Sequence, residues 1–281
     1  MERALWGSRE RSSVLTRRPR ALRSSGFRYL LGGGCALALL LMPARGAASV
    51  LAESGVFVRT GIFNSLDGAR RLSREKLDLV SASLERVTGW RGIHFEDDAV
   101  LCLRETRESG TGSATARTLV LKAVRTTAIV LEDHSRSFSV AFAAIRRDAL
   151  YHLTSGEVIP RFTLLLDFDD FQYLAGHPEA LAAFDLGFVL LHELVHAVED
   201  RRDPIGLQGA SEPGDCETIV NEVRRELGLP VRAHYHSERV IPSLLSDFSL
   251  GRLRFERVVE RAGKPRIEVY FVQWPKNFVV R

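Results

Sequence analysis

The sequence predicts an α+β fold, in a single domain over residues 47–281 that follows an N-terminal export segment. Apolar residues recur at helical spacing over 73–87 and again over 178–198, which predicts two amphipathic or buried helices. Short runs rich in β-branched and aromatic residues lie between and after these segments. No repeat and no Pro/Ser-rich linker divides residues 47–281, so we expect one core in which helices pack on a mixed or antiparallel sheet.

Residues 1–46 have the three parts of an export signal. An Arg-rich start precedes an apolar stretch over 29–42, and small residues follow at 44 and 46–48. The apolar stretch is short for a membrane span, which needs roughly 20 residues, so we expect its removal, with anchoring as the alternative. This predicts an extracytoplasmic protein, periplasmic or secreted, that contacts a membrane only through an uncleaved N-terminal segment.

Charge and cysteine content limit the partners and the compartment. The whole chain carries a net charge of +4 and residues 1–46 carry +7, which leaves about −3 for the rest. A mildly acidic body offers no electrostatic basis for binding nucleic acid. Export would bring Cys102 and Cys216 into an oxidising compartment, where they are either paired or buried as free thiols.

The predicted elements follow in chain order. The helix over 73–87 stops at Gly89, which is typical of a helix C-terminus. The strands predicted outside the helices are 93–95, 99–103, 126–131 paired with 138–142 in a hairpin, 162–168, and a C-terminal hairpin of 253–259 and 267–271 turned by 262–265. Residues 108–113 are expected to form a loop.

The second helix, 178–198, carries the chemistry. His192 and His196 are four residues apart, so both imidazoles lie on one helix face and can bind one zinc ion at ~2.0–2.1 Å. Glu193 lies one position round the helix, where its carboxylate can take a proton from a metal-activated water. Two His and a Glu on an apolar helix are destabilising unless they are paired or bind metal, so the motif indicates a catalytic zinc site.

A catalytic zinc site needs a third protein ligand. A further helix is predicted with Asp215 as N-cap and Gly228 near its end, and Glu217 and Asn221 share one of its faces. We expect Glu217 to be the third ligand and Asn221 to hydrogen-bond an imidazole from behind. Glu222 is the alternative ligand, displaced by about 140° around the same helix.

Three segments together resemble a known family. LLHELVHAVED at 190–200, the E-x-x-x-N pair of 217–221 and RRELGLPVRAHY at 224–235 resemble the effector-type zinc metallopeptidases of bacterial secreted effectors and polymorphic toxins, which are gluzincin-like zincins. The resemblance covers about residues 160–236. It implies a zincin-like catalytic core with an active-site helix and a second metal-ligand helix. It also implies the roles of ligand, base and ligand for His192, Glu193 and His196. The residues that match the downstream pattern are Asn221, Arg224, Gly228, Pro230, Arg232 and Tyr235.

Several residues outside the motif have expected roles. Tyr235 is expected to hydrogen-bond the oxyanion of the tetrahedral intermediate, with core packing as the alternative. His234 and His236 are either exposed or spare metal ligands. The strand over 162–168 is expected to be the sheet edge to which an extended peptide substrate adds its backbone.

The sequence thus predicts an exported zinc-dependent metallopeptidase that hydrolyses a protein or peptide substrate with Glu193 as general base. Zinc would bring the pKa of the attacking water from 15.7 toward ~7 and polarise the scissile carbonyl. Two alternatives stay open. The protein is either a zinc hydrolase that acts on a non-peptide amide, or a non-catalytic binding protein in which zinc has only a structural role, here called a zinc staple. Glu193 argues against the staple, because a structural site uses four protein ligands and needs no base.

Overall fold

The computed structural model describes residues 59–104, 106–135, 137, 140–152, 158–206, 211–242 and 249–275. They belong to the second of the two units into which the chain divides, Ala48–Arg281. The export segment predicted over 1–46 lies outside the described residues, as do Phe138 and its neighbour at 139. Cys102 and Cys216 are free thiols.

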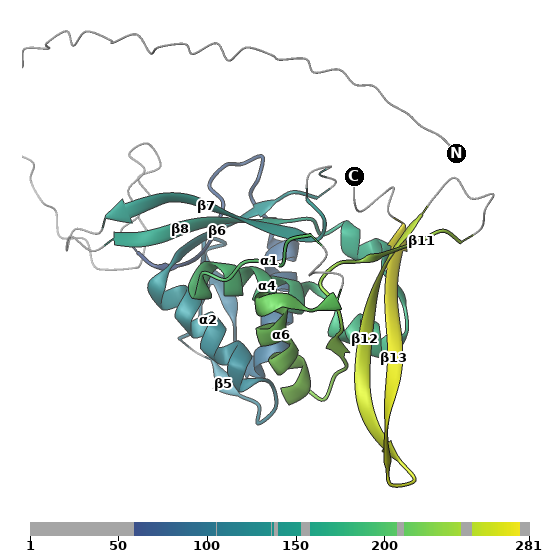
Figure 1. Ribbon diagram of the computed structural model, residues 1–281. Helices are drawn as coiled ribbons and strands as arrows, with labels where there is room; N and C mark the ends of the chain where they lie inside the picture. Colours follow the sequence, from purple (N-terminus) through teal and green to yellow (C-terminus); the bar gives the residue numbers. More distant parts are fainter. Residues whose placement is uncertain are drawn as a thin grey trace, which may run out of the picture. The chain divides into compact units, whose positions relative to one another are not determined.

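The described residues form an α+β fold with a mixed sheet, as predicted. The helices are α1 (Arg74–Thr88), α2 (Ala114–Thr126), the 3-10 turn η1 (Asp170–Tyr173), α3 (Pro178–Ala183), α4 (Leu186–Glu199) and α6 (Gly214–Glu226). The strands are β1 (Gly61–Asn64), β2 (Trp90–Arg91), β3 (His94–Glu96), β4 (Val100–Cys102), β5 (Arg107–Glu108), β6 (Ala128–Asp133), β7 (Ala143–His152), β8 (Val158–Leu166), β9 (Ala175–Gly176), β10 (Val231–Arg232), β11 (Glu238–Val240), β12 (Leu250–Arg261) and β13 (Lys264–Pro275). Helices α1, α2, α4 and α6 gather on one face of the main sheet (Figure 1).

The main sheet has the strand order β3-β4-β1-β6-β8-β7. Strands β1, β6 and β8 run parallel, whereas β7 runs antiparallel to β8 at one edge. The hairpin predicted between 126–131 and 138–142 is therefore wrong, because β8 lies between β6 and β7. Helix α2, which the sequence analysis did not predict, lies between the parallel strands β1 and β6 in the chain and packs on both. Strand β8 is internal, so it is not the edge expected for substrate addition.

The segment predicted as a single helix over 178–198 forms two helices, α3 and α4. Phe184 and Asp185 separate α3 from α4, and the Asp185 side chain accepts hydrogen bonds from the backbone N–H groups of Gly187 and Phe188. This capping starts a new helix. Together, Pro178–Glu199 is the one helical segment among the described residues that is long and apolar enough to cross a membrane, but 72% of its most apolar stretch is buried inside the protein. This burial is typical of a helix in the core of a protein.

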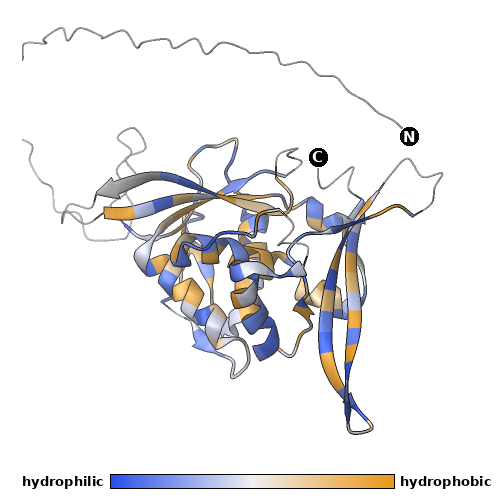
Figure 2. Cartoon of the chain, viewed as in Figure 1, coloured by the Kyte–Doolittle hydropathy of each residue, from blue (hydrophilic) through white to orange (hydrophobic). Residues whose placement is uncertain are grey.

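The C-terminal hairpin is confirmed and is longer than predicted. Strands β12 and β13 pair from Leu250 with Pro275 to Arg261 with Lys264, and Ala262 and Gly263, both at positive φ, make the two-residue turn. Hydrophobic and hydrophilic residues alternate along both strands (Figure 2). The half of the hairpin near the body buries Leu253, Phe255, Val272 and Trp274 in a core that it shares with Phe142, Ala180, Ala183, Phe184 and Val189. The hairpin thereby covers the start of α4.

Candidate metal centre

The two histidines of α4 use the same ring nitrogen, Nδ1, for a hydrogen bond. Their ring centroids are 5.0 Å apart. The Nδ1 atom of His192 lies 3.1 Å from a carboxylate oxygen of Glu217, and Nδ1 of His196 lies 2.8 Å from the carbonyl oxygen of Arg201. Both partners are acceptors, so each Nδ1 carries the proton that it donates. The Nε2 atoms are therefore the ones that can bind a metal.

A carboxylate lies between these two Nε2 atoms. Asp203 Oδ1 is 3.1 Å from Nε2 of His192, and Asp203 Oδ2 is 3.2 Å from Nε2 of His196. Asp203 Oδ1 is buried, and the His192 ring is its polar neighbour in the described part of the chain. Two imidazole nitrogens and one carboxylate around a common point are the donor set of a catalytic zinc site with one open position. The residues present fit a zinc ion.

The sequence analysis did not single out Asp203. It lies beyond α4, seven residues after His196, in the turn that leads back toward α6. The available signal was an acidic side chain shortly after the second histidine. Spacing alone could not separate Asp203 from the nearby Glu199, Asp200 and Glu212.

Cys216 lies close to this group but on the far side of His196. One donor atom from each of His192, His196, Asp203 and Cys216 lies within 4.8 Å of the others. The Cys216 sulfur, however, is 3.4 Å from Nδ1 of His196, the nitrogen opposite the one that faces Asp203. We therefore place Cys216 behind the imidazole, outside the set of three ligands.

Glu217, the predicted third ligand, instead holds His192 from behind. Its side chain is 1% exposed and forms ion pairs with Arg224 and, at 3.1 Å, with Arg232. Burial opposes ionisation, but the two guanidinium groups and His192 outweigh it and hold the pKa of Glu217 well below its usual range. An ionised carboxylate on Nδ1 fixes the imidazole orientation and makes Nε2 a stronger donor. Glu217 therefore contacts Nδ1 of His192, which is the nitrogen that faces away from Asp203.

The other predicted residues of α6 also have different neighbours from those expected. Asn221 binds no imidazole; its Nδ2 donates to the Arg232 carbonyl at 2.9 Å, and its Oδ1 accepts from the Arg232 N–H at 2.8 Å. It thus anchors β10 to α6. Glu222 is 57% exposed and pairs with Arg225 on the helix surface, away from the histidines. Asp215 is in the first turn of α6 and not the N-cap, because the helix starts at Gly214 after Pro213.

Tyr235 supports the site through Asp203. Its ring stacks on His192 at 6.0 Å between centroids, and its hydroxyl donates a hydrogen bond of 2.7 Å to Asp203 Oδ2. Burial, with Asp203 next, raises the pKa of Tyr235, so the phenol keeps its proton. His236 Nε2 binds the Gly206 carbonyl at 2.9 Å, and Nδ1 of His234 is buried without a partner in the described residues. Neither histidine belongs to the group around Asp203.

Glu193 lies next to the histidines, and opposing effects act on the pKa of its carboxyl. Burial raises the pKa of its carboxyl, and the two neighbouring imidazoles partly offset that rise. The backbone of Ile145 in edge strand β7 also acts to lower the pKa of this carboxyl. A carboxyl with a raised pKa beside a metal is suited to accept and return a proton.

The pKa values of both imidazoles are raised, so the site favours a positive charge at Nε2. Burial lowers the pKa of both rings, but hydrogen bonds to Asp203 and Glu217 outweigh it and raise the pKa of His192 to about 10. Contacts with Asp203, Cys216 and Arg201 similarly raise the pKa of His196 to about 11. A proton on Nε2 occupies the position that a metal ion would take.

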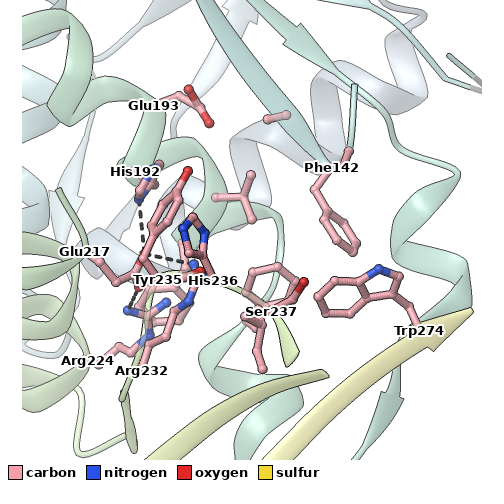
Figure 3. Close-up of a pocket in the computed structure, with 16 residues that line it drawn as sticks. Phe142, His192, Glu193, Glu217, Arg224, Arg232, Tyr235, His236, Ser237 and Trp274 are labelled. Carbon is pink, nitrogen blue, oxygen red and sulfur yellow. Dashed lines mark hydrogen bonds and ion pairs between the residues drawn. The ribbon is translucent and has the colours of Figure 1, made fainter. Parts of the chain in front are cut away.

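A cavity of about 270 Å³ opens beside His192 (Figure 3). Its polar lining residues are His192, Glu193, Glu217, Arg224, Arg232, Tyr235, His236 and Ser237, and its apolar lining residues are Ala141, Phe142, Ala143, Phe184, Phe188, Val189, Leu253 and Trp274. Phe142 and Trp274 lie on the side of the cavity away from Glu217, which we call its apolar end (Figure 3). Comparisons of the chain with family models, with characterised proteins and with solved structures find no match.

Proposed function

We propose that the chain is an exported zinc-dependent metallopeptidase with a zincin-like core, in which His192, His196 and Asp203 bind the zinc ion. The observation that carries the proposal is the Asp203 carboxylate lying 3.1 and 3.2 Å from the two Nε2 atoms, with Glu193 on the same helix. A donor set of two imidazoles and one carboxylate with an open position favours zinc in a catalytic role.

The chain's own residues then have defined tasks. Glu217 and the Arg201 carbonyl fix the two imidazoles, and Tyr235 fixes Asp203. A bound zinc ion would lower the pKa of an attacking water and polarise the scissile carbonyl. Glu193 accepts the proton of that water and delivers it to the departing amine. We assign the Tyr235 hydroxyl to Asp203 instead of to the oxyanion, because its proton is already donated there.

The edge strand β7 is the proposed site for the substrate backbone. It pairs with β8 on one side only among the described strands, and it packs against α4, the helix that carries Glu193. An extended peptide can add to such an edge by main-chain hydrogen bonds, which need few specific side chains. A peptide bound there would pass directly beside the general base.

Metal content tests the ligand assignment. We expect both Asp203→Ala and His192→Ala to lose stoichiometric zinc, and Glu193→Gln to keep it. Full zinc binding by Asp203→Ala, measured by elemental analysis after dialysis, would contradict the assignment.

Cleavage tests the reaction. The zinc-loaded mature protein should cleave members of a broad peptide library, and the Glu193→Gln variant should not. Absence of cleavage with zinc fully bound would favour a non-peptide amide substrate or a zinc-stapled binding protein.

A further inference from the structure

The apolar end of the cavity has no part in the proposed zinc chemistry. It is continuous with His192 and Glu193, since all of them line one cavity of about 270 Å³. Pockets for whole small molecules are typically about 300–1,000 Å³. This space is therefore suited to a single side chain of a longer ligand whose backbone passes outside it.

Four separate segments supply a cluster of aromatic side chains, the aromatic wall, at this end. The Phe142 ring makes edge-to-face contacts with Phe171, Phe184 and Trp274, at centroid distances of 5.3, 5.1 and 5.2 Å. These residues come from the start of β7, the turn η1, the break between α3 and α4, and the C-terminal hairpin. Figure 3 shows Phe142 and Trp274 on the side of the cavity away from Glu217. Edge-to-face contacts of this kind stabilise the wall without any ligand.

Phe142 is held there in a strained backbone conformation. Its φ of 62° lies in the left-handed region, which a bulky residue rarely adopts. The Phe142 N–H donates to Asp170 Oδ2 at 2.9 Å, and its carbonyl accepts from the Asp167 N–H at 2.9 Å. Asp170 is 3% exposed. Strain that buried partners maintain in this way is a feature of ligand-binding sites.

Trp274 owes its position to a glycine on the facing strand. Trp274 pairs with Gly251 in the β12–β13 register, and a Cβ at Gly251 would lie 2.5 Å from the indole Cε2. The missing side chain allows the indole to lie across the hairpin and face the cavity. Its Nε1 is buried and has no acceptor among the described residues.

We propose that this apolar end is a specificity pocket for one aromatic side chain of the peptide substrate, at the residue next to the scissile bond. The proposal rests on the proposed peptidase function. An aromatic ring is favoured over an aliphatic chain because the wall presents ring faces and edges that a further ring can meet edge to face. Asp170 is a positioning residue, which acts through Phe142.

Matched peptides test the pocket. We compare zinc-loaded protein on peptides that differ only by Phe, Leu, Ala or Asp at the position beside the cleaved bond. We expect Phe to exceed Ala by about 10–200-fold in kcat/KM, the range that burial of extra apolar groups gives. Trp274→Ala and Gly251→Ala should bring this ratio close to one at unchanged zinc content. Gly68→Ala is the control, because no atom lies within 4 Å of its added Cβ.

The outcomes separate the pocket from the reaction. Cleavage with equal rates for Phe and Ala, or a Phe preference that Gly251→Ala and Trp274→Ala leave unchanged, would overturn the pocket and leave the peptidase intact. If no peptide is cleaved, the reaction is overturned, and calorimetric binding of the Phe and Ala peptides to Glu193→Gln decides the pocket. Tighter binding of the Phe peptide that Gly251→Ala abolishes supports the pocket, and equal binding contradicts it.

Discussion

Glu217→Gln is the substitution that best separates the two possible ligand sets of the proposed zinc site. The wild-type carboxylate is 1% exposed and contacts Arg224, Arg232 and Nδ1 of His192. Gln keeps the shape of the side chain but leaves the buried Arg224 without its counter-charge. Removal of one partner of a buried ion pair costs about 3–5 kcal/mol of unfolding free energy. For a domain of this size, that corresponds to a fall in Tm of roughly 6–20 °C.

The effect on zinc should be smaller than the effect on folding. Loss of a carboxylate that holds a ligating imidazole typically weakens metal binding by about 10–100-fold, and the stoichiometry stays at one ion. Denaturant unfolding of the zinc-free protein and a competition titration with a zinc chelator measure the two effects. Glu222→Gln is the matched control on the same helix, because Glu222 is 57% exposed and should change stability by no more than about 0.5 kcal/mol.

Two results would refute this reasoning. Complete loss of zinc in Glu217→Gln, with Asp203→Ala still binding one ion, would make Glu217 the ligand and Asp203 a bystander. Unfolding of Glu217→Gln at the same denaturant concentration as Glu222→Gln would show that the buried ion pair does not stabilise the fold.

The remaining predictions concern protons, the Tyr235 hydroxyl and a helix cap. Since the pKa values of His192 and His196 are raised to about 10 and 11, both rings are protonated at neutral pH without metal, so zinc affinity should rise with pH and binding should release up to two protons. Calorimetry in buffers of different ionisation enthalpy measures this release, and its absence would contradict the site. Tyr235→Phe keeps the ring stack but frees Asp203, so zinc affinity should fall about tenfold. A loss of about 10²–10³ in kcat at unchanged zinc affinity would instead assign the hydroxyl to the oxyanion. Asp185→Ala removes the cap of α4 and should lower the unfolding free energy by about 1 kcal/mol in denaturant titrations, whereas no change would show that the cap is dispensable.

Local patterns predicted the elements whose causes are themselves local. Gly89 ends α1 as expected, and Ser73, where the predicted helix began, is its N-cap, since capping depends on a few neighbouring residues. The C-terminal hairpin also followed from alternation around a two-residue turn. The break at Asp185 was missed, because the apolar content on both sides outweighed a single capping residue.

Strand order depended on contacts that are distant in the sequence. Strands β6 and β7 are neighbours in the chain, yet β8 lies between them in the sheet. A strand that prefers a parallel partner gives no local sign of it, so the pattern suggested a hairpin. For the same reason, the sequence analysis expected β8 at the sheet edge, where β7 lies instead.

The sequence by itself determined the centre of the site. His192, Glu193 and His196 are within one helical turn or so, and the period of the α-helix fixes how they lie relative to one another. Only the tertiary structure decided the rest, because the two nitrogens of an imidazole face opposite ways and sequence spacing does not say which carboxylate meets which nitrogen. Glu217 approaches Nδ1 from α6, and Asp203 approaches Nε2 from the turn after α4. The aromatic wall likewise exists only where β7, α4 and the C-terminal hairpin meet.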